Sequence, residues 1–68
     1  MKQAELFKAV RALRLTITKD DAGEYRIAVP LDQVAGRDKD RQEAGAYYTD
    51  DRDDALATAK AIRAALDA

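Results

Sequence analysis

The densest group of chemically useful side chains is the acidic run Asp50-Asp51-Arg52-Asp53-Asp54. Carboxylates bind hard cations, but calcium takes about six to eight oxygens from a loop that bends around it. This run leads directly into an Ala-rich amphipathic segment, and Arg52 in its middle opposes a cation. Negative side chains at the start of a helix cap its free N–H groups and complement its dipole. We therefore interpret the run as a helix start.

A second acidic stretch, Asp38-Lys39-Asp40, resembles the opening of an EF-hand loop. That loop requires glycine at its sixth position and glutamate at its twelfth. Here those positions hold Glu43 and Thr49. The chain also has no Cys and no His, the usual ligands of zinc, haem and iron–sulfur clusters. We expect no metal and no cofactor.

Catalytic residue types are scarce as well. The sequence contains no Ser, Cys, His, Asn or Trp. The common nucleophile–base pairs and the commonest acid–base catalyst are therefore missing. Sixty-eight residues also leave no room for a deep cleft between subdomains. We expect a protein that is not an enzyme.

Basic residues gather at the N-terminal end of the chain. Residues 1–19 carry five basic residues and one acidic residue, whereas residues 20–68 carry seven basic and twelve acidic ones. Lys8, Arg11 and Arg14 follow at a spacing of three, so the first two share a helix face. The favoured interpretation is the solvated side of a helix with a Glu5–Lys8 pair. The alternative is a small basic patch for phosphates or an acidic partner, which would bind nucleic acid only weakly.

Arg26 and Tyr47 are the pair of greatest interest, because both are predicted on an open sheet face. They could be an ordinary cross-strand pair. They could also form the centre of a homodimer, where Tyr and Arg are enriched, or a platform on which a base stacks. The candidate interaction surface predicted from the sequence is Arg26, Tyr47, Lys8 and Arg11.

Hydrophobic periodicity predicts the elements that position these residues. Apolar residues at helical spacing indicate a first helix over Gln3–Ala12 and a last helix that Thr49 or Asp50 caps. Period-two alternation indicates strands over about 15–19, 24–31 and 43–48, with a turn at Asp20–Gly23. Residues 32–43 are undetermined, and 36–41 are expected to form a charged, mobile tip. Because Tyr47 and Tyr48 are adjacent, we expect one of them in the core.

This order predicts a single α+β domain over residues 1–68, with the arrangement α-β-β-β-α. The economical packing is a three-stranded antiparallel meander with both helices on one face. One sheet face would then stay exposed.

The chain resembles two known families. Glu24-Tyr25-Arg26-Ile27, Glu43–Asp51 and Asp54–Lys60 resemble short, uncharacterised proteobacterial and prophage-associated proteins over about residues 24–62. That resemblance implies a mobile-element or accessory setting and carries no activity. The element order is also similar to the double-stranded RNA-binding domain. That family begins its last helix with lysines on the phosphates, whereas this chain has aspartates there.

The sequence thus favours a small non-catalytic accessory protein, a protein–protein interaction module that binds a protein partner or itself. The alternative is a weak nucleic-acid-binding module that uses the basic first helix and the open sheet face. No apolar stretch reaches the length of a membrane span, and the N-terminus lacks the apolar region of a signal peptide. We therefore expect a cytoplasmic protein with no membrane partner.

Overall fold

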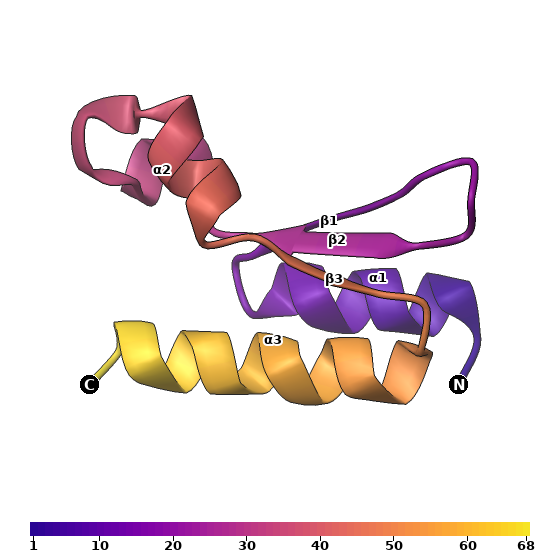
Figure 1. Ribbon diagram of the computed structural model, residues 1–68. Coiled ribbons are helices and arrows are strands. Elements are labelled where there is room, and N and C mark those ends of the chain that lie inside the picture. The colour runs from indigo at the N-terminus through magenta and orange to yellow at the C-terminus, as the bar shows by residue number, and fades with distance from the viewer.

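The computed structural model describes residues 1–68 and confirms the predicted α+β order, with one additional short helix. Two long helices cover one face of a three-stranded antiparallel sheet of order β1-β2-β3 (Figure 1). The elements are α1 (Gln3–Ala12), β1 (Thr16–Lys19), β2 (Tyr25–Ala28), α2 (Lys39–Ala44), β3 (Tyr47–Thr49) and α3 (Arg52–Leu66). Two short 3₁₀ turns, Leu31–Gln33 and Ala35–Arg37, precede α2.

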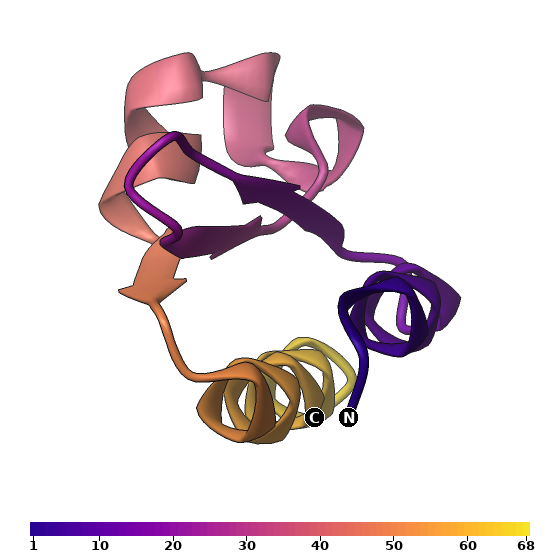
Figure 2. The same cartoon turned by 90° about the vertical axis from the view of Figure 1, so that its right-hand side faces the viewer.

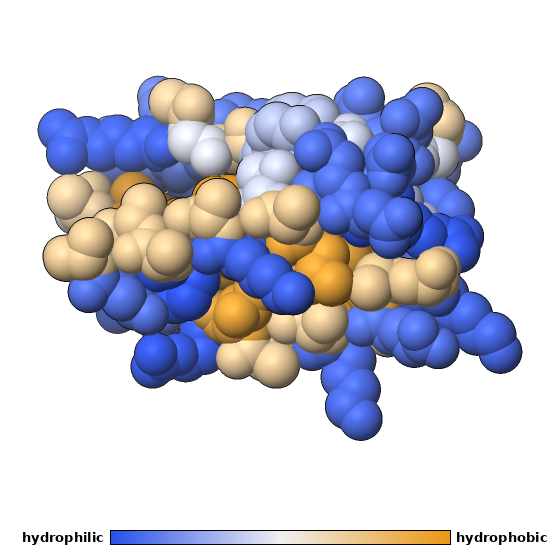
Figure 3. All heavy atoms as spheres, turned by 90° about the horizontal axis from the view of Figure 1, so that it is seen from below, coloured by the Kyte–Doolittle hydropathy of each residue, from blue (hydrophilic) through white to orange (hydrophobic).

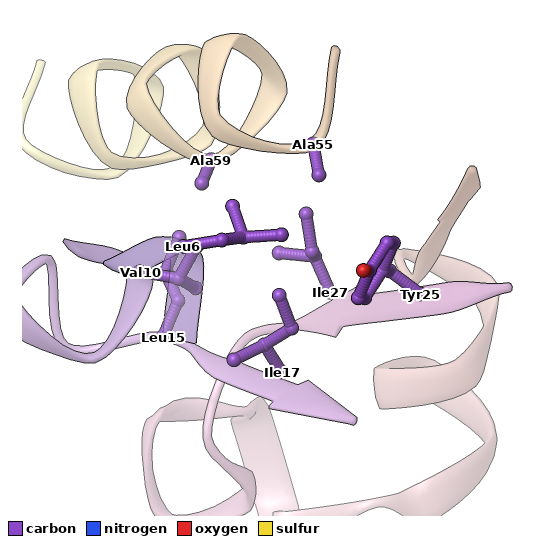
Figure 4. Packing of buried hydrophobic residues seen from close by; sticks show 8 residues of the cluster. All are labelled: Leu6, Val10, Leu15, Ile17, Tyr25, Ile27, Ala55 and Ala59. Atoms are coloured by element: carbon purple, nitrogen blue, oxygen red, sulfur yellow. The ribbon is translucent and has the colours of Figure 1, made fainter. Parts of the chain in front are cut away.

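The core lies between the sheet and the two long helices (Figure 4). It consists of Leu6, Val10, Leu15, Ile17, Tyr25, Ile27, Ala55 and Ala59. α3 contributes only alanines to the fully buried set, and a methyl side chain lets a helix backbone approach the sheet closely. The predicted Ala-rich face of α3 is therefore its packing face.

α1 ends at Ala12 as predicted, and a left-handed residue stops it. Arg14 has φ 59°, and its N–H donates to the carbonyl of Arg11 at 2.9 Å. The N–H of Leu15 reaches the carbonyl of Val10 at 3.4 Å. These two bonds form a Schellman motif, in which glycine usually takes the left-handed position. The motif turns the chain directly from α1 into β1.

Replacing Arg14 with glycine should stabilise the fold by about 0.5–1 kcal/mol, because a left-handed backbone costs a residue with a Cβ atom more than it costs glycine. Urea unfolding followed by circular dichroism measures the change. Arg14→Ala keeps the Cβ atom and should change the free energy of unfolding by much less. If both variants stabilise the protein equally, the left-handed backbone of Arg14 is not strained.

The register of the sheet assigns opposite faces to neighbouring residues of β2. Tyr25 and Ile27 are buried towards the helices, whereas Arg26 points to the second face and is half-buried. Ala28 lies two residues after Arg26 and projects to the same face, yet it is fully buried. The segment 31–44 lies above this face, at the end of the sheet where β2 leaves it (Figures 1 and 2). The Gln42 side chain fastens it there by donating to the carbonyl of Val29 at 2.9 Å.

The expected charged tip at 36–41 is wrong in its second half, because α2 begins at Lys39. Asp38 caps α2 by accepting hydrogen bonds from the N–H groups of Asp40 and Arg41. The preceding turn uses left-handed backbone at Gly36 and Arg37. Since residues 39–44 are helical, the third strand cannot start at Glu43 and begins at Tyr47 instead.

α3 is capped by Asp51, not by Thr49 or Asp50 as predicted. The Asp51 carboxylate accepts from the N–H groups of Asp53 and Asp54 at 2.8 and 3.1 Å. The Thr49 hydroxyl instead accepts from the N–H of Asp51 at 3.2 Å and thereby orders the cap. The acidic run is therefore a helix start, as interpreted.

Asp51→Ala should lower the free energy of unfolding by about 1 kcal/mol, because two N–H groups of the first turn lose their acceptor. Asp50→Ala is the matched control, since it removes a carboxylate from the same run and leaves the cap intact. Urea unfolding of both variants measures the difference. An equal loss in both would show that general acidity, not the cap, stabilises the start of α3.

Candidate functional site

Both tyrosines of the edge strand β3 are exposed, Tyr47 by 36% and Tyr48 by 44%. The expectation that one of them lies in the core is wrong. Neither closes the core, because residues of α1, β1, β2 and α3 already form the buried cluster. The two rings project to opposite sides of β3, as adjacent strand residues must.

The expected pairing of Arg26 with Tyr47 is also wrong. Arg26 lies opposite Tyr48 in the register, and Tyr47 lies opposite Ile27. Tyr47 therefore shares the helix side of the sheet, and Tyr48 shares the second face with Arg26. The pairing differs because β3 begins at Tyr47 and not at Glu43. A shift of one residue in the register of a strand moves each of its side chains to the other face.

Arg26 and Tyr48 converge on one carboxylate, that of Glu43 at the end of α2. Nε and Nη2 of Arg26 donate to Glu43 Oε1 at 3.1 and 2.9 Å. The Tyr48 hydroxyl donates to Glu43 Oε2. Three donors from two neighbouring strands thus hold a single acidic group.

These contacts change the acidity of all three groups. The Tyr48 hydroxyl and then Arg26 lower the pKa of Glu43. The same hydrogen bond raises the pKa of Tyr48. Partial burial opposes the charge of Arg26, but Glu43 and Tyr48 outweigh it and raise the pKa of the guanidinium. The carboxylate is therefore ionised and the phenol neutral at neutral pH.

The Arg26–Glu43–Tyr48 group should make the free energy of unfolding depend on pH in the acidic range. A lowered pKa means that Glu43 contributes stability above its ordinary value of 4.5 and loses it as the pH falls through the lowered value. Glu43→Gln should therefore be less stable than the wild type at pH 7, and the gap should close in acid. Chemical unfolding of both proteins at several pH values measures this gap. A gap that stays constant below pH 4.5 would contradict the assigned ion pair.

Tyr47 makes the corresponding contact on the other side of β3. Its hydroxyl donates to Asp54 Oδ2 in the first turn of α3 at 2.7 Å. This hydrogen bond raises the pKa of Tyr47. β3 is thus fixed on one side to α2 and on the other to α3. We call Arg26, Glu43, Tyr47, Tyr48 and Asp54, which lie on both sides of this edge strand, the β3 surface.

Lys8 and Arg11 lie elsewhere. Both are exposed on α1, and the guanidinium of Arg11 lies 5.4 Å from the centre of the Phe7 ring. α1 covers the helix side of the sheet, whereas Arg26 points to the second face. The predicted surface of Arg26, Tyr47, Lys8 and Arg11 is therefore not one surface. The predicted Glu5–Lys8 pair is absent from the three ion pairs of the structure.

The outer side of the helical layer mixes hydrophilic and apolar side chains (Figure 3). Met1 and Leu66 are large apolar residues that stay exposed. No group of three or more acidic side chains is arranged to hold a metal ion, and the surface has no pocket. No helix is both long enough and apolar enough to cross a membrane.

Two residues of the β3 surface, Glu43 and Asp54, were missed as functional candidates. Glu43 was assigned to the third strand, so its position at the end of a helix was hidden. Asp54 was assigned only to the helix start, and it serves there as well. Tyr47 and Asp54 are seven residues apart, and a turn lies between them. No strand or helix period therefore relates the two residues.

The comparisons with protein-family models, with curated protein sequences and with solved structures gave no match to this chain.

Proposed function

We propose that this protein is a small non-catalytic protein-interaction module that binds an extended segment of a protein partner along the free edge of β3. The observation that carries the proposal is the exposure of Tyr47 and Tyr48 on an edge strand. An edge strand offers unpaired N–H and C=O groups to a further strand, and its side chains supply specificity.

The contacts of the two rings support this role. Tyrosines are favoured at interfaces because they supply a large contact area at a low cost in conformational entropy. Here the hydroxyl of Tyr47 is tied to Asp54 and that of Tyr48 to Glu43, which orders both rings before a partner arrives. Ordered groups bind with less loss of freedom.

The other edge of the sheet is less suited to strand addition. β1 ends in Lys19, and a lysine on an edge strand is a common device against pairing with another chain. The Thr16 hydroxyl donates to the carbonyl of Ala28 and so turns inward. β3 carries no charged residue and no proline.

A titration with a short extended peptide tests the proposal. The probe is the blocked pentapeptide Thr-Val-Gln-Val-Thr, followed by amide chemical shifts. We expect shifts at 47–49 and unchanged amides in β1. The variant Tyr47→Ser/Tyr48→Ser should lose them, and Lys8→Gln/Arg11→Gln should keep them. Shifts confined to β1, or none at all, would refute binding at β3.

Self-association is a separate outcome that sedimentation at increasing protein concentration measures. A second copy would pair its own β3 with this edge, and the apparent mass would rise with concentration. The Tyr47→Ser/Tyr48→Ser variant should then remain a monomer. A wild-type protein that stays monomeric at its highest soluble concentration would exclude the homodimer.

A weak nucleic-acid-binding module remains the second proposal, and the exposed Lys8 and Arg11 on α1 are what favour it. It must do without Arg26, which binds Glu43 on the second face of the sheet. So few cations give weak binding that falls steeply with salt. Binding of oligonucleotides at low salt tests it, and no binding there would refute it.

We further propose a cytoplasmic, mobile-element-associated setting, which rests on the sequence and its resemblance alone.

A further inference from the structure

We infer that Arg26 and Tyr48 form a receptor for one carboxylate of the partner segment, and that Glu43 occupies this receptor in the free protein as an internal competitor. The inference rests on the proposed strand addition at β3, and it names the chemistry of the partner.

The receptor is more fixed than its occupant. The Arg26 side chain is 26% exposed and that of Glu43 is 53% exposed. Arg26 stands on the middle strand, where its neighbours across the ladders are Thr18 and Tyr48. The two guanidinium N–H groups are therefore held more firmly than the Glu43 carboxylate, and the Tyr48 hydroxyl beside them donates to whichever carboxylate lies there. The carboxylate of Glu43 shows which chemistry these three donors accept.

The segment that carries Glu43 can move without opening the buried cluster between the sheet and the two long helices. Neither of the two 3₁₀ turns nor α2 contributes a buried residue. Besides the bonds of Glu43, the Gln42–Val29 hydrogen bond fastens α2 to the sheet. Segments with few buried contacts belong to the least stable parts of a fold. Glu43 can thus withdraw while β1, β2, α1 and α3 stay packed.

An added strand brings a new side chain within reach of the receptor. The partner residue opposite Tyr48 projects to the same face as Tyr48 and Arg26. Its backbone lies two strand spacings of about 4.8 Å from that of Arg26, which the two long side chains span together. A Glu or Asp at this one position can therefore accept the hydrogen bonds that Glu43 gives up.

The charges around β3 limit the partner to one acidic residue at that place. Asp50 and Asp51 follow the C-terminal end of β3, and Asp54 lies on its helix side. A uniformly acidic segment would be repelled there. A single carboxylate flanked by neutral, strand-forming residues fits the receptor.

The test compares two blocked peptides, Thr-Val-Glu-Val-Thr and Thr-Val-Gln-Val-Thr, on the wild type and on Glu43→Ala. We expect Glu43→Ala to bind the Glu peptide about tenfold more tightly than the wild type does, because a site occupied internally for about nine-tenths of the time loses that factor in apparent affinity. Affinity for the Gln peptide should not change. The double variant Glu43→Ala/Arg26→Gln should lose the preference for Glu.

Chemical shifts of the Arg26 Nε–H group and of the β3 amides separate the two proposals. If both peptides move the β3 amides equally in Glu43→Ala, the receptor is refuted and strand addition stands. If the Glu peptide moves only Arg26, the receptor is supported and strand addition fails. No shift in either place refutes both. Glu43→Gln is a second variant that keeps the side-chain volume, and it should show a smaller gain than Glu43→Ala.

Discussion

Ile27→Ala should lower the free energy of unfolding by about 3–4 kcal/mol, in the upper part of the range for a large-to-small change in a core. Ile27 is fully buried on the middle strand of the sheet. It packs in one cluster with Leu6 and Val10 of α1 and with the small alanines of α3. Backbones on both sides hold these neighbours, so the cavity cannot collapse around the missing atoms.

The loss is large because the domain is small. At about 0.05–0.15 kcal/mol per residue, a chain of this length has about 3–10 kcal/mol in total. Urea unfolding followed by circular dichroism should therefore show the midpoint of Ile27→Ala at a much lower urea concentration than that of the wild type. Ile27→Val, which removes one methylene, should cost about 1 kcal/mol. Leu66→Ala is the surface control, since Leu66 is 47% exposed. A loss below 1 kcal/mol for Ile27→Ala would contradict a closed core.

The long helices were predictable because their periodicity extends over several turns. Leu6 and Val10 of α1, and Ala55 and Ala59 of α3, recur at the spacing of one helix face, and all four are buried. The end of α1 at Ala12 was also predicted, since the period changes from helical to alternating after Leu13. Local sequence and tertiary packing agree in these elements.

α2 was not predictable, because its residues carry no apolar stripe. Six residues are too few for a helix that forms by itself. The Asp38 cap and the contacts of Gln42 and Glu43 with the sheet stabilise it. Two of these three contributions come from residues distant in the sequence, which no local pattern reveals.

The error at α2 propagated into the candidate site. A third strand that starts at Glu43 leaves its register open, and a register shift of one residue exchanges Tyr47 and Tyr48. The residue types of the site were therefore predicted in part, whereas the pairing of Arg26 with Tyr48 was not. Because α2 was not predicted, Glu43 was not predicted as the acidic partner of this pair either.

Arg63→Ala should lower the free energy of unfolding by about 2 kcal/mol. Its side chain is 14% exposed and reaches from α3 to the end of α1. Nε donates to the carbonyl of Leu13 at 2.7 Å and Nη2 to that of Arg14 at 3.1 Å. Carbonyls at the end of a helix have no partner within the helix. Alanine would leave both without this donor, and a hydrogen bond to a charged group contributes about 1.5–3 kcal/mol.

The geometry of the guanidinium makes lysine a poor replacement. Arg63 uses a third nitrogen, Nη1, on Asp67 at 3.4 Å, so one planar group joins three acceptors. Arg63→Lys offers a single ammonium and should recover less than half of the loss. Lys60→Ala, three residues earlier on α3, is the matched control and should leave stability within about 0.5 kcal/mol, as exposed substitutions usually do. Urea unfolding compares the three variants with the wild type. The contacts with Leu13 and Arg14 require a loss of stability that is specific to Arg63. If Arg63→Ala and Lys60→Ala lose equal stability, Arg63 acts only through its charge near the C-terminal end of the helix.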